Sequence, residues 1–298
     1  MNKLIVILGP TASGKTDLAI KLAKKYNGEI VSADSRQIYK GMDIGTAKPL
    51  DLKGIPHWLI DIKNPNQNYT VAQFKKNAIK AIKNIQKHGK LPILVGGTGL
   101  YIKAVAENLD IPKIKADLKL RERLEKEAKK KGLDFIFQKL IKLDPEAAYI
   151  VDPKNPRRVI RALEVTLLTK KPFSKQRKTG PLLFDVLELG VFVPKEKLKE
   201  RINLRINKMI ENGLVDEVKD LVKKYGSDCQ AFDAIGYREI IDFLAKKTTL
   251  ERAIELIKTN TWHFAKRQLT WFRADRKIRW ISSKKEAGRL IDRFLEQQ

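Results

Sequence analysis

The sequence predicts an α/β protein in which a parallel sheet is flanked by helices and interrupted by a mostly helical insertion. Three observations support this prediction. Short apolar runs typical of buried strands recur at residues 4–8, 29–33, 54–61, 91–95 and 185–193. Segments with helical periodicity separate most of these runs, as expected of a parallel sheet. Between residues 115 and 180 the pattern is mostly helical, and the charge becomes strongly positive.

The first apolar run is followed by GPTASGKT at residues 9–16, which fits the pattern G-x-x-x-x-G-K-[ST] of a phosphate-binding loop. Residues 17–26 carry Leu and Ala at helical spacing, so the loop lies between a strand and a helix. The N-terminus of this helix offers unpaired N–H groups and a positive dipole end to an anion. We therefore expect a P-loop NTPase-like parallel sheet. Its expected phosphate-binding residues are Gly9, Pro10, Thr11, Ala12, Ser13, Gly14, Lys15 and Thr16.

The second apolar run ends at Asp34, at the edge of the sheet where ligands bind in open α/β folds. The polar segment 34–49 that begins there contains Gly41, Gly45 and Pro49, which argue against a long helix. Asp34 is therefore a candidate for acid–base work beside the phosphate loop. A helix N-cap or an indirect partner of Mg²⁺ is the alternative interpretation.

The strand at residues 91–95 follows a predicted amphipathic helix at 69–88 and ends in Gly-Gly-Thr-Gly at 96–99. Two glycines at the end of a strand allow a ligand to approach the backbone closely. A P-loop enzyme that hydrolyses nucleotides normally has an acidic residue here, which holds Mg²⁺ and helps to orient water. Glycine and threonine stand at this position, which weakens an ATPase interpretation.

The charge of the chain indicates a polyanionic partner. There are 61 Lys+Arg against 35 Asp+Glu residues, a formal net charge of +26. Residues 115–180 hold 19 basic and 9 acidic side chains, and an Asn-Pro pair at 155–156 predicts a helix that carries Arg157, Arg158 and Arg161 on one side. We expect this segment to contact a nucleic-acid backbone. A general preference for lysine and a basic face without a ligand are the alternatives.

The C-terminal half combines helical patterns with further basic residues. A long helical region is expected at 197–224, broken near Gly213, and AIGYRE at 234–239 places Arg238 at the start of another helix. Residues 258–280 carry seven basic side chains and one acid, interleaved with aromatic residues. This mixture suits the stacking of bases, and it suits the two sides of an amphipathic helix equally well.

The composition excludes several classes of site. The single cysteine, Cys229, excludes an internal disulfide and a zinc site built on paired cysteines. The three histidines lie far apart and suggest no metal cluster. The N-terminus begins directly with the first strand, and no apolar run is long enough to cross a membrane. We expect a cytoplasmic protein without a targeting segment.

Six segments in one order closely resemble the tRNA dimethylallyltransferases, also called tRNA isopentenyltransferases, in their compact bacterial form. They are GPTASGKT, ADSRQIYKGMDIGTAKP, LVGGTGLYIKAV, NPRRVIRALEV, AIGYRE and AKRQLTWFR. The resemblance covers nearly the whole chain. It implies transfer of the dimethylallyl group from dimethylallyl diphosphate to the N6 amine of the adenosine adjacent (3′) to the anticodon in tRNA, with release of diphosphate. With one cysteine, the chain cannot form the C-terminal zinc finger of the eukaryotic members.

The resemblance also implies roles for individual residues. Asp34 is the general base, and Lys15, Thr16 and Arg238 stabilise the leaving diphosphate. Thr16 binds the cofactor, Mg²⁺. The residues implied to contact tRNA are Asp34, Ser35, Arg36, Gln37, Thr98, Arg157, Arg158, Val159, Ile160 and Arg161.

The expected organisation follows from the same segments. Residues 1–114 and 185–298 form the catalytic core, and residues 115–184 form the insertion that contacts tRNA. The expected partners are the anticodon stem-loop of tRNA and dimethylallyl diphosphate, and nothing in the chain calls for more than a monomer. The ATP-binding loop leaves a nucleotide kinase or an RNA-dependent ATPase open, as well as an RNA-binding protein without activity. Enzymes that prenylate free adenine nucleotides share the first motif but generally lack the basic insertion and the AKRQ segment.

Overall fold

The computed structural model describes residues 2–49, 54–111, 117–176 and 179–297. The chain divides into two units, which we call the core unit, Met1–Ala106 with Leu182–Gln298, and the insertion unit, Glu107–Pro181. The sequence predicts boundaries between residues 114 and 115 and between residues 184 and 185. In the structure both boundaries fall earlier in the chain, after Ala106 and after Pro181. The first predicted boundary itself lies outside the described residues.

The core unit contains a six-stranded sheet with the order β3-β2-β4-β1-β5-β6, and its pairings are parallel. The strands are β1 (Lys3–Leu8), β2 (Gly28–Ser32), β3 (His57–Trp58), β4 (Leu91–Gly96), β5 (Asp185–Val191) and β6 (Arg279–Ile281). The five predicted strands are present, although β3 has only two residues. The sequence does not predict β6, because three residues are too few to show a period.

Both faces of the sheet are covered by helices. Along β1, Leu4, Val6 and Leu8 pack on one side against α2 (Val71–Lys87) and α3 (Gly99–Ala106). Ile5 and Ile7 pack on the other side against α1 (Lys15–Lys25) and α12 (Lys284–Glu296). Because both sides of the strand are buried, its sequence is continuously apolar and does not alternate.

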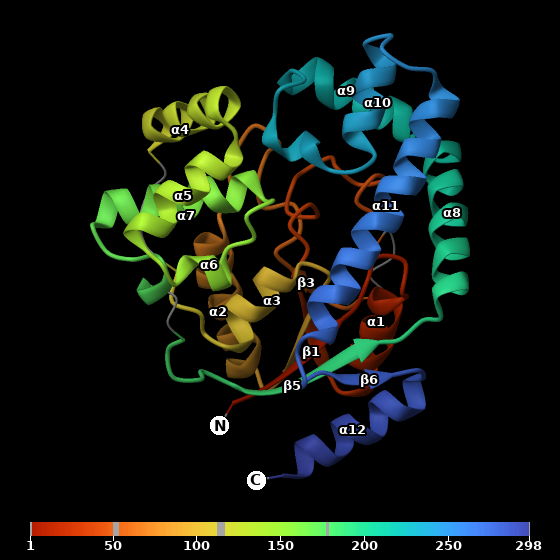
Figure 1. Ribbon diagram of the computed structural model, residues 1–298. Helices are drawn as coiled ribbons and strands as arrows, with labels where there is room; N and C mark the ends of the chain where they lie inside the picture. The colour runs from red at the N-terminus through yellow and green to blue at the C-terminus, as the bar shows by residue number, and fades with distance from the viewer. Residues whose placement is uncertain (1, 50–53, 112–116, 177–178, 298) are drawn as a thin grey trace. The chain divides into compact units, whose positions relative to one another are not determined.

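The remaining helices of the core unit form a further apolar cluster, separate from those on the two faces of the sheet. They are α8 (Lys195–Glu211), α9 (Leu214–Tyr225), η2 (Gln230–Asp233), α10 (Tyr237–Leu244) and α11 (Leu250–Arg273). Figure 1 shows α8 and α11 side by side. The predicted break is confirmed, since Gly213 separates α8 from α9 with a φ of 93°, which glycine adopts without strain. The cluster also includes Ile38, Tyr39 and Met42, so the polar segment 34–49 is packed onto these helices.

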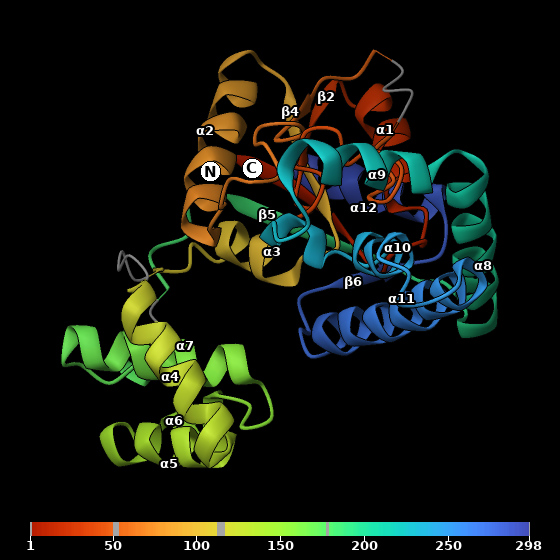
Figure 2. The same cartoon turned by 90° about the horizontal axis from the view of Figure 1, so that it is seen from above.

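The insertion unit is built from α4 (Leu118–Lys131), α5 (Leu133–Leu143), α6 (Ala147–Ile150), α7 (Pro156–Thr169) and η1 (Ser174–Gln176). Figure 2 shows α4 to α7 gathered together, and their buried side chains form an apolar cluster of their own. Asn155 caps α7 by accepting a hydrogen bond from the Arg158 N–H at 3.1 Å, as the Asn-Pro pair predicts. None of the helices in the described part of the chain is long and apolar enough to span a membrane.

The parallel topology brings three segments to one edge of the sheet. Leu8 of β1 pairs with Gly96 of β4, and Ser32 of β2 pairs with Val95 of β4, so the three strands end at the same level. The loop 9–16, the segment 34–49 and the turn 97–99 all begin there. This edge is where ligands bind in open α/β sheets.

Candidate active site

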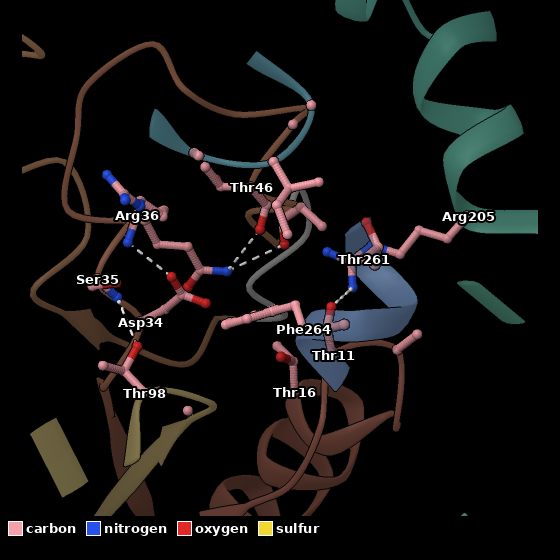
Figure 3. Close-up of a pocket in the computed structure, with 18 of the residues that line it drawn as sticks. Thr11, Thr16, Asp34, Ser35, Arg36, Thr46, Thr98, Arg205, Thr261 and Phe264 are labelled. Atoms are coloured by element: carbon pink, nitrogen blue, oxygen red, sulfur yellow. Dashed lines mark hydrogen bonds between the residues drawn. The ribbon is translucent and has the colours of Figure 1, made fainter. Parts of the chain in front are cut away.

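A cavity of about 340 Å³ lies at this edge and is lined by residues of the core unit (Figure 3). The sequence-predicted residues that line it are Thr11, Ala12, Lys15, Thr16, Asp34, Ser35, Arg36, Gln37 and Thr98. Apolar side chains from α8 and α11 complete the wall, among them Ile202, Ile206, Met209, Ile257 and Phe264. The cavity therefore suits a ligand with a charged end and a hydrocarbon part.

The loop 9–16 has the backbone of an anion cradle. Gly14 adopts a φ of 87° immediately before α1, which begins at Lys15. The Lys15 Nζ donates to the Pro10 carbonyl at 3.2 Å, so the ammonium group folds back over the loop. Desolvation lowers the pKa of Lys15 to about 8, while the Asp34 carboxylate acts against this shift. Four of the predicted loop residues do not line the cavity: Gly9, Pro10, Ser13 and Gly14.

Asp34 is held by its own segment at the mouth of β2. Its Oδ1 accepts the Arg36 N–H at 2.8 Å, and the Ser35 N–H donates to the Thr98 hydroxyl oxygen at 3.2 Å (Figure 3). The residues after Asp34 form turns, so the N-cap interpretation is wrong. Its carboxylate is half-buried and lies within electrostatic range of Lys15 and Arg205.

Two arginines of α8 reach the phosphate loop. The Arg205 Nη1 donates to the Thr11 hydroxyl at 3.2 Å, and the Arg201 Nη1 donates to the Ser13 carbonyl at 3.3 Å. Burial lowers the pKa of Arg205, and Asp34 raises it. The sequence signal was their spacing of one helical turn, which places both on one face. The spacing does not reveal which loop that face meets, so the sequence assigned neither residue to the site.

The resemblance implied that Arg238 stabilises the leaving diphosphate, but the structure does not place this side chain in the cavity. Its side chain is exposed and is not part of the cavity wall. The neighbours on either side make the buried contacts of the AIGYRE motif. The Tyr237 hydroxyl donates to Glu217 at 2.5 Å, and Glu239 accepts from Asn260 Nδ2 at 2.7 Å.

The glycines after β4 serve packing. A Cβ at Gly97 would lie 2.3 Å from the Gln268 Nε2, and one at Gly99 would lie 2.2 Å from the Trp271 Nε1. The same Gln268 accepts the Thr11 N–H and donates to the Gly97 carbonyl, both at 2.8 Å. The glycines at 97 and 99 therefore admit α11. Gly96, at the end of β4, lines the cavity, and there the close approach of a ligand stays a prediction.

The aromatic residues of α11 divide between its two sides. Phe272 is buried against the sheet, and Trp262 packs within the helical cluster. Phe264 lines the cavity beside Arg267, whose guanidinium lies 5.9 Å from the ring centroid, and Trp271 keeps 44% of its surface exposed. The amphipathic interpretation of this segment is therefore confirmed, and the stacking of bases on its exposed aromatic rings stays a prediction.

The five predicted contacts of the insertion unit are not equivalent. Val159 and Ile160 are 0% and 5% exposed and belong to the apolar cluster, so their assignment to nucleic acid is wrong. Arg161 donates to the fully buried Glu164 at 2.8 Å, together with Arg121 from α4. Arg157 is exposed, and Arg158 and Arg161 are half-exposed.

Comparisons with known proteins agree with this geometry. The profile of a family described as IPP transferase matches residues 37–275. The chain is 48% identical over 284 residues to a tRNA dimethylallyltransferase of Bacillus mycoides, with 94% of this chain and 90% of the relative covered. It is 49% identical to that of Carboxydothermus hydrogenoformans, covering 96% of this chain and 94% of the relative.

Solved structures give the same result. The full-length tRNA isopentenylpyrophosphate transferase of Bacillus halodurans superposes with a TM-score of 0.75 at 42% identity, over 100% of this chain and 98% of the other. A eukaryotic dimethylallyltransferase acting on tRNA superposes with a TM-score of 0.78 at 35% identity, over 91% of this chain and 70% of the other.

Proposed function

The chain belongs to the IPP transferase family and transfers a dimethylallyl group from dimethylallyl diphosphate to tRNA, and we propose that the transfer takes place in the cavity of the core unit. One observation carries the proposal. The cations Lys15 and Arg205 and the carboxylate of Asp34 border a single cavity that also has an apolar wall. The cations suit the diphosphate, the apolar wall suits the hydrocarbon group, and the carboxylate suits an incoming amine.

Departure of the diphosphate is assisted by the phosphate loop. When the allylic C–O bond breaks, its electron pair goes to the diphosphate oxygen and positive charge builds on the carbon. N–H groups at the start of α1, the Lys15 ammonium group and the Arg205 guanidinium stabilise the negative charge. In this proposal Arg205 takes the role that the resemblance implied for Arg238.

Asp34 acts on the acceptor. The exocyclic N6 amine of adenosine is a weak nucleophile and loses a proton as it bonds to the allylic carbon. The Asp34 carboxylate takes this proton, and the Arg36 N–H keeps the carboxylate in one orientation. Because the target base belongs to a loop, it leaves the stack to enter the cavity.

Mg²⁺ would be held mainly by the donor. No group of three or more His, Cys, Asp or Glu side chains within the described residues could hold a metal ion. The Thr16 hydroxyl, which lines the cavity, fits a magnesium ion that keeps waters and binds phosphate oxygens. The ion would add positive charge beside the leaving group.

The acceptor is proposed to be the adenosine on the 3′ side of the anticodon, presented by the anticodon stem-loop. The enzyme is proposed to work as a monomer, because one chain supplies the described lining of the cavity. A cytoplasmic location is proposed. The single cysteine cannot form a disulfide within the chain, and disulfides are typical of proteins in oxidising compartments.

The proposed reaction is tested by incubating the protein with labelled dimethylallyl diphosphate, Mg²⁺ and unmodified tRNA. Nucleoside analysis should recover the label on the N6 position of one adenosine per tRNA. Label elsewhere, or phosphate release from ATP without any prenyl donor, would refute the proposal.

The affinity for the donor is expected to fall as the pH rises above about 8. The Lys15 pKa of about 8 leaves roughly nine-tenths of the ammonium groups neutral at pH 9 in the free protein. Diphosphate favours the charged form, so binding takes up close to one proton at pH 9 and almost none at pH 6.5. Calorimetry of dimethylallyl diphosphate binding in buffers of different ionisation enthalpy measures this uptake. Subtracting the uptake of Lys15→Met isolates the lysine, and equal uptake by both proteins would contradict the assignment.

Arg157 and Arg158 are expected to contact tRNA phosphates. Replacing both by alanine should reduce the slope of log K against log salt by about 1.4–1.8, since each phosphate contact contributes about 0.7–0.9. Filter binding of tRNA between low and high salt measures the slope. The matched control is Lys129→Ala with Lys130→Ala, which removes two exposed charges from α4. An equal change in both proteins would show a general charge effect in place of specific contacts.

A further inference from the structure

Glu217, near the start of α9, accepts hydrogen bonds from the backbone of the segment 34–49. Its Oε2 accepts the N–H groups of Asp43 and Ile44 at 2.9 and 2.6 Å, and its Oε1 accepts the Gly45 N–H at 3.2 Å. Three consecutive backbone donors thus converge on one carboxylate, as they would on a bound anion. The reaction described above makes no use of this group.

Tyr237 donates a further hydrogen bond to the same carboxylate. Its hydroxyl donates to the Glu217 Oε1 at 2.5 Å, and its ring is fully buried. Burial and the nearby carboxylate raise the pKa of Tyr237, so the hydroxyl remains a donor. A Cβ at Gly45 would lie 2.5 Å from the ring, so the backbone of the segment rests directly on the tyrosine.

The residues that follow this contact form a wall of the cavity. Gly45, Thr46 and Ala47 line it, and Figure 3 shows Thr46 on the far side from Thr11 and Thr16. The Gln37 Nε2 donates to the carbonyls of Thr46 and Ala47 at 3.4 and 3.3 Å. The Gln37 Oε1 in turn accepts the Ser32 hydroxyl at 3.0 Å. The wall is therefore connected to the end of β2, from which the catalytic carboxylate extends.

A second anchor lies at the end of the same segment. The buried Lys48 ammonium group pairs with Asp43 at 2.6 Å and with Asp61 at 2.5 Å, and it donates to the Tyr39 carbonyl. This anchor holds the segment to itself and to the chain after β3. Glu217 and Tyr237 supply hydrogen bonds that fix the wall to the helical cluster.

We propose that Glu217 and Tyr237 are positioning residues for the acceptor: they hold the wall 45–47 against which the flipped adenosine is placed beside Asp34. The proposal rests on the proposed function. The phosphate loop is contacted by Arg201, Arg205 and Gln268. The residues that hold the wall are therefore different from those that hold the loop proposed to bind the donor. Loosening the wall should therefore impair use of tRNA and spare binding of dimethylallyl diphosphate.

The test is Glu217→Gln, which keeps the shape and replaces one acceptor oxygen by a donor. We expect kcat/KM for tRNA to fall about tenfold to a hundredfold, since small displacements of a reacting group have effects of this size. The Kd for dimethylallyl diphosphate should stay within about twofold of wild type, as expected for an intact phosphate loop. Gly45→Ala should produce the same split by pressing on Tyr237, and Tyr237→Phe a smaller one of about fivefold.

Asp216→Asn is the matched control, because it removes an exposed carboxylate from the adjacent position of α9. It should leave both constants unchanged. Wild-type transfer is measured first, so a failure of the proposed function is seen before any variant is compared. An unchanged kcat/KM for tRNA in Glu217→Gln overturns the proposal. A parallel loss of donor affinity and melting temperature also overturns it, because Glu217 would then only stabilise the fold.

Discussion

Asp34→Asn is expected to lower the rate of dimethylallyl transfer by about 10³-fold, within the range for loss of a general base. Asparagine keeps an oxygen that can accept the Arg36 N–H, so the turn at the end of β2 is retained. What is lost is the ability to take a proton from the N6 amine. Single-turnover kinetics with saturating tRNA and labelled dimethylallyl diphosphate measures the chemical step directly.

Donor binding should survive this substitution, because the phosphate loop and Arg205 are unchanged. Asp220→Asn, on the exposed side of α9, is the control for a loss of one carboxylate from the same unit and should react at the wild-type rate. A wild-type rate in Asp34→Asn would remove Asp34 as the base. An equal loss of donor affinity would assign its role to the diphosphate or to Mg²⁺.

Arg205→Gln is expected to lower kcat by about 10²-fold to 10³-fold, which is typical when one donor to a developing negative charge is removed. The side chain reaches the Thr11 hydroxyl and lies in the same cavity as Lys15. Its charge therefore acts where the diphosphate departs. Steady-state kinetics should also show a higher KM for dimethylallyl diphosphate, with the KM for tRNA little changed.

Arg238→Gln is the comparison that decides between the two arginines. Its side chain is exposed and outside the cavity wall, so this variant should retain the wild-type kcat. The reverse result, a slow Arg238→Gln and a normal Arg205→Gln, would restore the sequence-based assignment and refute the structural one.

The sequence predicted well those features that depend on neighbours along the chain. The phosphate loop is recognisable because a strand, two glycines, Lys15 and a helix follow one another within a short stretch. The same holds for the cap of α7 and for the break at Gly213, which depend on local backbone geometry. The position of Asp34 beside this loop was predicted correctly, because a strand end in a parallel sheet has a known position relative to ligands.

The sequence-based assignments are weakest where a pattern shows which side chains share one face of a helix but not what that face packs against. The resemblance implied that Arg238 of AIGYRE acts on the diphosphate, and this stays a prediction; the buried contacts of the motif belong to Tyr237 and Glu239. The run of residues 157–161 was read as a set of contacts, although helical geometry turns Val159 and Ile160 into the apolar cluster. Short elements such as β6 and α3 carry too few residues to reveal a period.

The sequence by itself therefore determined the parallel sheet, the glycine-rich loop between β1 and α1, the place of Asp34 at the end of β2 and the basic insertion. The tertiary structure alone decided that Arg205 and not Arg238 meets the loop, that Gln268 and Trp271 occupy the space above the glycines, and that Glu217 holds the wall of the cavity. These contacts join residues more than 150 positions apart. Helical spacing determines only which side chains share a face, and the packing of α8, α9 and α11 determines what each face meets.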